Sequence, residues 1–221
     1  MNLVMSEKIS ESDVTAVWAG LRPLISGGTV GNKTADLSRK HGVSTSDGGV
    51  TTITGGKLTT YRRMSADTVD RVANRLGINA KSRTKHVPLF GAEGDHGSDE
   101  HLAGRFGSAS GDVAAIASSD PALAEPLVEG LPYSRAEAVY AVRFEMAQSL
   151  SDVLERRTRS RILARDASLA AAHSTASIIG AELGWDLSRE QAEVSAYRAA
   201  IEHERSVGGL PAAATDNGFG A

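Results

Sequence analysis

The pattern that most constrains the fold lies in the stretch TTITGGKLTTYRR, residues 51–63. A β-branched run there ends at Gly55 and Gly56, and from Leu58 to Leu76 apolar residues recur at steps of three and four. Alternation marks a strand and the longer step marks a helix, so the backbone changes conformation at the glycines. The stretch therefore predicts a strand, a glycine turn and a helix in immediate succession.

Further β-prone segments precede this turn. Segments near 41–46 and 50–54 are separated by SDGG, and Asp-Gly between β-prone runs is a strong hairpin signal. Residues 14–22, VTAVWAGLR, are apolar and β-prone and predict a short strand that leads into a loop at Pro23. Gly77 stands where the C-terminal cap of the predicted helix belongs. We expect short strands, a hairpin and one helix.

The second half of the chain is predicted to be mainly helical. Residues 78–97 hold a proline and several glycines without a period, and are the expected linker. The Gly-rich residues 206–221 are expected to form a disordered tail. Helices are predicted near 99–106, 110–118, 134–157, 167–184 and 189–205, the last with a capping box from Ser188 to Gln191. The expected fold class is α+β.

Composition excludes several kinds of function. The 221 residues include 24 basic and 27 acidic side chains, a net charge of −3, which argues against nucleic-acid binding driven by overall charge. The chain has no cysteine, so thiolate catalysis, disulfides and cysteine-based metal sites are excluded. No apolar run approaches the roughly 20 residues that span a bilayer. The expected location is cytoplasmic or peripheral to a membrane.

Three familiar ligand-binding motifs are either absent from the sequence or wrongly spaced in it. GGTVGNKT at 27–34 has the wrong spacing for a phosphate-binding P-loop, and no G-x-G-x-x-G dinucleotide fingerprint is present. The histidines show no H-E-x-x-H spacing. His96 and His101 lie near acidic residues in a predicted loop, where solvated side chains are the better interpretation, and we predict no metal site.

An arginine run at 154–165, LERRTRSRILAR, admits two interpretations. Arginines near a helix end usually pair with acids or complement the helix dipole, and this structural interpretation is favoured. Docking onto another domain or onto anionic lipid is the alternative. The run contains Arg156, Arg157, Arg159, Arg161 and Arg165.

The glycine turn also suggests a site for an anion. The backbone N–H groups of Lys57, Leu58 and Thr59 are expected to be unpaired at the start of the helix, with the helix dipole behind them and the Lys57 ammonium beside them. Such a site suits a ligand that gains negative charge, for example the N1–C2=O edge of a flavin on reduction. Arg22, before Pro23, suits a phosphate or carboxylate. On these residues alone, a purely structural role carries as much weight.

The order of several motifs resembles the later part of FAD-dependent glycerol-3-phosphate dehydrogenases. These motifs are DVTAVWAGLRPL, SRKH, GGVTTITGGKLTTYRRMSADTVDRV, TKHVPLFGA and AVYAVRFEMAQSLSDVLERRTR. The resemblance covers roughly residues 2 to 205. It implies that 1–77 form the C-terminal part of an FAD- and substrate-binding domain, that 78–97 form a linker, and that 98–205 form an α-helical C-terminal domain.

The resemblance assigns roles to individual residues. Arg22 in GLRPL matches a substrate-site arginine that is expected to bind phosphate or polarise the reacting oxygen. Arg39 in SRKH matches a second arginine at the substrate site. The family often has an acidic residue where Lys40 stands, so contacts there are expected to differ. The segment expected against the pyrimidine edge of the flavin comprises Gly56, Lys57, Leu58, Thr59 and Thr60.

The implied activity is the oxidation of sn-glycerol 3-phosphate to dihydroxyacetone phosphate, with FAD as cofactor and a membrane quinone as acceptor. The family's N-terminal FAD fingerprint region has no counterpart in this sequence, so we expect the chain alone to be inactive. An N-terminal half on another chain is then an expected partner. Two rival functions stay open: an oxidase that passes electrons to oxygen, and a non-catalytic helical assembly module.

Overall fold

The computed structural model describes residues 6, 8–20 and 40–210. The chain divides into two compact units, each described here by itself. The hairpin unit comprises Ala19–Ala92, and the helical unit comprises Met1–Trp18 together with Glu93–Ala221. A two-stranded antiparallel sheet in one unit and helices in the other confirm the expected α+β class.

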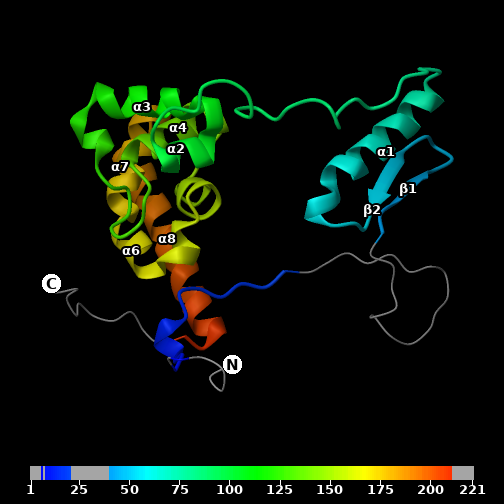
Figure 1. The fold of residues 1–221 in the computed structure, drawn as a ribbon. Helices are drawn as coiled ribbons and strands as arrows, with labels where there is room; N and C mark the ends of the chain where they lie inside the picture. The colour runs from blue at the N-terminus through cyan, green and yellow to red at the C-terminus, as the bar shows by residue number, and fades with distance from the viewer. Residues whose placement is uncertain (1–5, 7, 21–39, 211–221) are drawn as a thin grey trace. The chain divides into compact units, whose positions relative to one another are not determined.

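The hairpin unit is a small sheet with one helix packed against it (Figure 1). The two strands are antiparallel, with Val43 opposite Ile53. The predicted hairpin is thereby confirmed, because its SDGG turn closes with Gly49 N–H donating to the Ser46 carbonyl at 2.9 Å. Its elements are β1 (Gly42–Thr45), β2 (Thr51–Thr54), the 3-10 turn η3 (Leu58–Thr60) and α1 (Tyr61–Arg75).

The end of α1 is fixed by a glycine, as the sequence predicts. Gly77 has φ of 73°, a left-handed conformation that costs glycine nothing. Its N–H donates to the Asn74 carbonyl at 3.2 Å, and the Ile78 N–H donates to the Ala73 carbonyl at 2.8 Å. These two bonds form a Schellman motif, which satisfies carbonyls that the helix end leaves free.

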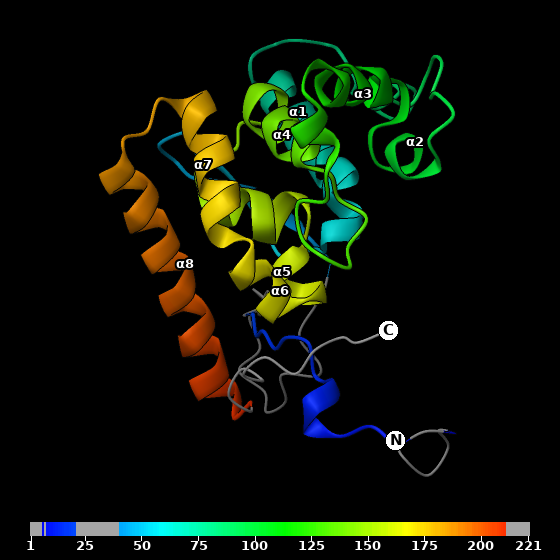
Figure 2. The ribbon, with the colours of Figure 1, turned by 90° about the vertical axis from the view of Figure 1, so that its left-hand side faces the viewer.

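The helical unit is a bundle of α-helices connected by short turns (Figure 2). Within it, α7 packs against both α4 and α8. Its helices are α2 (Glu100–Phe106), α3 (Ser110–Ser119), α4 (Arg135–Glu145), α5 (Ser160–Leu163), α6 (Arg165–Ala170), α7 (Ala172–Leu183) and α8 (Leu187–Gly208). The shorter elements are η1 (Glu11–Asp13), η4 (Gly107–Ala109), η5 (Pro121–Ala124) and the π-helix η6 (Asp152–Arg157).

The single helix predicted over 134–157 is wrong. The chain leaves α4 at Met146, whose φ of 58° is left-handed, and the N–H of Ala147 donates back to the Ala141 carbonyl at 2.9 Å. The helical path resumes at Leu150 and continues into η6 with π-type winding. Side chain–backbone bonds from distant residues stabilise this break, and a periodic apolar pattern does not encode such bonds.

The other helices of the second half differ from prediction in detail. Helices near 99–106 and 110–118 are confirmed, whereas the one predicted at 167–184 is interrupted at Ala171, between α6 and α7. The cap of α8 is Asp186, not Ser188, because the Asp186 carboxylate accepts from the Arg189 N–H at 2.7 Å. An aspartate caps a helix start as well as a serine does, and its negative charge also complements the helix dipole, so α8 begins two residues earlier than predicted.

The strand predicted at 14–22 is absent from 14–20, the part that the structure describes. The N–H of Val17 donates instead to Glu204 Oε1 of α8 at 3.0 Å. A Cβ placed on Gly208 would lie 2.5 Å from Val17 Cγ2, so this segment approaches the end of α8 closely. The helix α8 continues through Gly208, past the expected start of the tail at 206, and 211–221 lie outside the described residues.

The two units differ in how much core they contain. In the helical unit the buried apolar residues form two clusters, one around Leu150, Leu154 and Ile179 and one around Val113 and Tyr140. In the described part of the hairpin unit, only Ala66 is buried. Burial of apolar surface is the main stabilising contribution to folding, so the helical unit has its own source of stability.

Candidate functional site

The predicted flavin-facing segment forms the turn between β2 and α1. Gly55 and Gly56 have φ of 74° and 79°, so the chain leaves the strand through two successive left-handed residues. A Cβ on Gly56 would lie 2.5 Å from Met64 Sδ and 3.3 Å from His41 Cβ. Both the conformation and the close approach require glycine at 56, which explains this residue by local packing.

The backbone donors of the turn are only partly free. The N–H of Lys57 donates to Thr60 Oγ1 at 3.0 Å, so the expectation that it is unpaired is wrong. The Thr60 hydroxyl in turn donates to the Lys57 carbonyl at 2.9 Å. The N–H groups of Leu58 and Thr59 form no hydrogen bond within the described residues, as expected at the start of a helical segment. Two donors of the turn are therefore without a partner among the described residues.

The side chains of the turn are exposed. The Lys57 ammonium forms no ion pair with any described residue, and the Leu58 side chain is 88% exposed. One free ammonium beside two free N–H groups makes this turn locally positive. The geometry can hold one edge of an anionic or hydrogen-bond-accepting ligand.

A charged cluster that sequence inspection missed lies behind the turn. His41 Nε2 lies 2.8 Å from Asp67 Oδ2, and Arg63 Nε lies 3.1 Å from the other carboxylate oxygen of Asp67. The hydrogen bond from His41 and the charge of Arg63 hold the pKa of Asp67 below its ordinary value. Arg63 and Asp67 have the i,i+4 spacing of a helix pair, but no local pattern predicts His41 as their partner.

The two arginines assigned to the substrate site, Arg22 and Arg39, lie outside the described residues. The structure therefore brings together Gly56, Lys57, Leu58, Thr59 and Thr60 without placing either arginine near them. The rejected P-loop sequence at 27–34 also lies outside the described residues.

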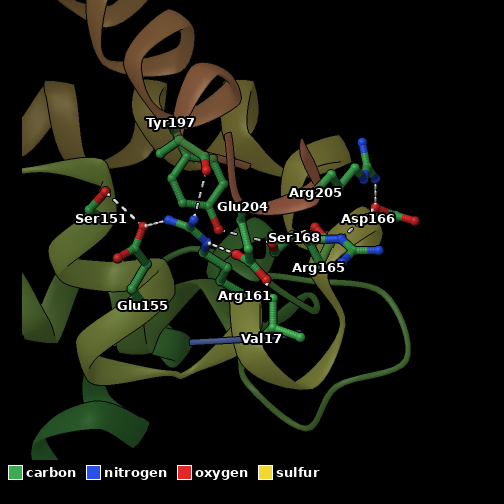
Figure 3. A network of polar contacts seen from close by, with 11 residues as sticks. Val17, Ser151, Glu155, Arg161, Arg165, Asp166, Ser168, Tyr197, Glu204 and Arg205 are labelled. Atoms are coloured by element: carbon green, nitrogen blue, oxygen red, sulfur yellow. Dashed lines mark hydrogen bonds and ion pairs between the residues drawn. The ribbon is translucent and has the colours of Figure 1, made fainter. Parts of the chain in front are cut away.

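The arginine run pairs with acids, as the favoured structural interpretation predicts. Arg161 lies at the centre of a network at the base of α8, shown in Figure 3. Its Nε donates to Glu204 Oε2 at 2.9 Å, and its Nη1 donates to Glu155. Burial alone would lower the pKa of Arg161, but these two carboxylates outweigh it and raise the pKa. Arg156 and Arg157 both bind Asp152, and Arg165 binds Asp166.

Tyr197 closes the same network. Its ring lies 6.0 Å from the Arg161 guanidinium carbon, and its hydroxyl lies 2.9 Å from Ser168 Oγ. Burial raises the pKa of Tyr197 to about 12. The network therefore connects η6, α5, α6 and α8, and Arg161 has a structural role in it.

His101, near the expected linker, also has a structural role. His101 Nε2 lies 3.0 Å from Glu137 Oε1, and the Arg105 guanidinium binds the other oxygen of the same buried carboxylate at 2.9 Å. Glu137 Oε1 also caps α4 by accepting from the Ser134 N–H at 2.9 Å. Among the described residues, no group of three potential metal ligands comes together.

Comparison with a solved structure gives the class of protein. The chain resembles the glycerol-3-phosphate dehydrogenase of Bacillus halodurans, solved in complex with FAD, with a TM-score of 0.67 and 26% identity. The match covers 90% of this chain and 41% of that one. The fold is thus that of the C-terminal portion of a dehydrogenase of this class.

The family model for the C-terminal domain of alpha-glycerophosphate oxidase matches residues 63–190, and the chain belongs to this family. Glycerol-3-phosphate dehydrogenase 2 of Mycobacterium tuberculosis is 36% identical over 92% of this chain. The mitochondrial glycerol-3-phosphate dehydrogenase of Rattus norvegicus is 35% identical over 85%. The chain spans 38% of the mycobacterial and 28% of the rat protein. The family resemblance found in the sequence is confirmed.

Proposed function

We propose that this chain is the C-terminal part of an FAD-dependent glycerol-3-phosphate dehydrogenase that converts sn-glycerol 3-phosphate to dihydroxyacetone phosphate. The observation that carries the proposal is the likeness, at a TM-score of 0.67, to a dehydrogenase of that name solved with FAD. The names of the mycobacterial and rat relatives, both glycerol-3-phosphate dehydrogenases, agree with the proposal.

The glycine turn fits one edge of a flavin. The free N–H groups of Leu58 and Thr59 and the Lys57 ammonium are the groups that would hold the pyrimidine edge, while Gly56 and Thr60 set the backbone path. FAD supplies the hydride acceptor when bound. Lys57 then stabilises the negative charge that forms at this edge, in the manner of preorganised donors at a reacting centre.

Substrate binding is assigned to the two arginines. In this proposal Arg22 and Arg39 hold the phosphate of glycerol 3-phosphate or polarise its reacting oxygen. A guanidinium forms two parallel hydrogen bonds to a phosphate, so these residues suit that task.

The hairpin unit supports a role as part of a larger domain. The side chains of Leu58, Val69 and Leu76 are 88%, 60% and 70% exposed, so the unit shows an apolar surface that its own residues do not cover. An isolated two-stranded hairpin is at best marginally stable in water. The proposed partner of this surface is the FAD-binding part of the fold, on this or another polypeptide.

The proposed electron acceptor is a membrane quinone, with the enzyme cytoplasmic and attached peripherally to the inner face of the cell membrane. Within the described residues, no helix is long and apolar enough to cross a bilayer.

Reconstitution tests the proposal. The 221-residue chain, mixed with FAD and freed of excess, is expected to show no flavin absorbance and no dye reduction by glycerol 3-phosphate. Co-expression with the FAD-binding part of the mycobacterial relative is expected to restore both. In that complex Lys57→Met should lower turnover about 10²–10³-fold, as loss of one preorganised donor does. Lys81→Met, in the same unit, is the matched control. Clear turnover by the chain alone, or a silent Lys57→Met, contradicts the proposal.

An oxidase is the second candidate, because the matching family model is named after alpha-glycerophosphate oxidase. Peroxide release by the reconstituted complex in air would identify it. The two cores of the helical unit favour a third candidate, a non-catalytic assembly module. A purified chain that is monomeric and binds no FAD-binding part would count against this third function.

A further inference from the structure

A cavity of about 390 Å³ opens on the helical unit, and none of the residues assigned to the proposed activity lines it. It lies where the end of α2, the end of α4 and the π-helix η6 meet. Its volume falls within the range of small-molecule sites. The cavity is lined by Arg105, Phe106, Glu145, Arg156 and Arg157.

The backbone around this cavity is unusual. Met146 and Arg159, which flank η6, have φ of 58° and 55°, and they are the only described non-glycine residues with positive φ. Such residues are strained, and both they and π-helices occur preferentially at functional sites. The two strained positions and the π-helix together set the position of Arg156 and Arg157 at the cavity.

Two of the three arginines are held in place. Arg105 binds Glu137 through Nε at 2.9 Å and the Arg157 carbonyl through Nη2 at 3.0 Å. Its guanidinium also lies 5.0 Å from the Phe106 ring centre and 4.9 Å from that of Tyr133. Arg157 donates to the Glu145 carbonyl. A ligand that meets these guanidiniums therefore loses little side-chain freedom in the protein.

The third arginine, Arg156, can exchange its ion-pair partner. Arg156 is 59% exposed, and its one ion-pair partner among the described residues is Asp152, four residues earlier on the same helical segment. Exposed pairs of this kind contribute little to stability, so an incoming anion can share or replace the carboxylate.

The charges that face the cavity are unbalanced. Its lining holds three guanidiniums and a single carboxylate, that of Glu145. The balancing acids do not line it: Glu137 is 1% exposed beneath Arg105, and Asp152 is shared by two arginines. The Glu145 carboxylate forms no ion pair within the described chain and remains able to accept a hydrogen bond.

We propose that this cavity is a binding site for a small organic phosphate that also carries a hydrogen-bond donor such as an ammonium or hydroxyl group. The phosphate meets the fixed guanidiniums of Arg105 and Arg157 and the mobile one of Arg156. The donor group meets Glu145, and the carbon skeleton lies against Phe106. A free metabolite and a phospholipid headgroup share this chemistry.

Titration calorimetry with phosphoethanolamine and with inorganic phosphate tests this site without FAD, so its outcome is independent of the proposed dehydrogenase activity. Arg156→Ala should weaken binding of both probes at least about tenfold, the loss expected for one charge-assisted contact. Arg189→Ala is the matched control, because Arg189 is 54% exposed, pairs at i,i+4 with Glu193 and lies outside the cavity. It should leave binding unchanged.

Glu145→Gln separates the two halves of the site. It should tighten inorganic phosphate, because a negative charge is removed, and weaken phosphoethanolamine, because the partner of the ammonium is lost. Sedimentation with phosphatidylethanolamine vesicles then identifies the source: Arg156-dependent sedimentation assigns a lipid headgroup, and its absence with retained phosphoethanolamine binding assigns a soluble ligand. Absence of binding to both probes, or equal losses in the Arg156 and Arg189 variants, overturns the proposal.

Discussion

The hairpin unit and the helical unit both contain helices, but the two units stabilise them differently. In the helical unit, α7 packs against α4 and α8, and the side chains of Leu150, Leu154 and Ile179 are completely buried in the core. In the hairpin unit, α1 covers two short strands and buries only Ala66 among the described residues. Local signals are therefore sufficient to form a helix and a hairpin, but only long-range packing makes a unit self-supporting.

The largest expected contrast comes from truncating one leucine in each unit. Leu154→Ala removes a fully buried side chain and should lower the free energy of unfolding by about 2–5 kcal/mol. The side chain of Leu76 is 70% exposed, so Leu76→Ala should change the free energy of unfolding by less than about 0.5 kcal/mol. Urea denaturation followed by circular dichroism measures both. Equal effects would mean that the apolar face of α1 is covered in solution.

Alkaline pH should weaken the helical unit through Tyr197. Burial raises the pKa of this residue from 10.0 to about 12, so the folded state keeps its proton while the unfolded state loses it. Stability that is present below pH 10 is then lost as the pH rises toward 12, by about 2–3 kcal/mol in total. Tyr197→Phe should be less stable at neutral pH and should lose less on alkalinisation. Parallel curves for the two proteins would contradict this assignment.

A smaller acid-dependent effect is expected in the hairpin unit. The hydrogen bond from His41 lowers the pKa of Asp67, so its contribution is present above the ordinary value of 3.8 and is lost as the pH falls through the folded-state pKa. As the pH is lowered from about 5 to below about 3, the NMR carbon chemical shifts of α1 should report loss of helix. This range begins above the pH of about 4 at which an unpaired aspartate titrates. Asp67→Asn should abolish this dependence, and an unchanged titration would show that the cluster does not support α1.

Much of the hairpin unit is predictable because its signals are local. The Asp-Gly turn, the glycine pair and Gly77 each act within a few residues, and the structure has all three where the sequence places them. The Lys57 N–H was predicted wrongly because a side chain three residues later, Thr60, accepts its hydrogen bond. A short polar side chain near a helix start competes for such donors.

The helical unit was harder to predict, because its breaks depend on contacts between distant residues. The end of α4 at Met146 is supported by the Arg157 guanidinium on the Glu145 carbonyl, a contact that spans the break. In place of the strand predicted at 14–22, the Val17 N–H donates to the Glu204 carboxylate of α8, which is distant in the sequence. The roles of Arg22 and Arg39 rest on family resemblance and remain predictions.

Hydrogen exchange measured by mass spectrometry on the 221-residue chain tests most directly whether the helical unit is self-supporting while the hairpin unit is not. Amides of α4 and α7 should exchange only through global unfolding of their unit, whereas those of α1 should exchange through low-energy local opening, orders of magnitude faster. Addition of the FAD-binding part of a relative should slow exchange in α1 and leave α4 and α7 unchanged. Equal protection of α1 and α7 in the chain alone would contradict the account.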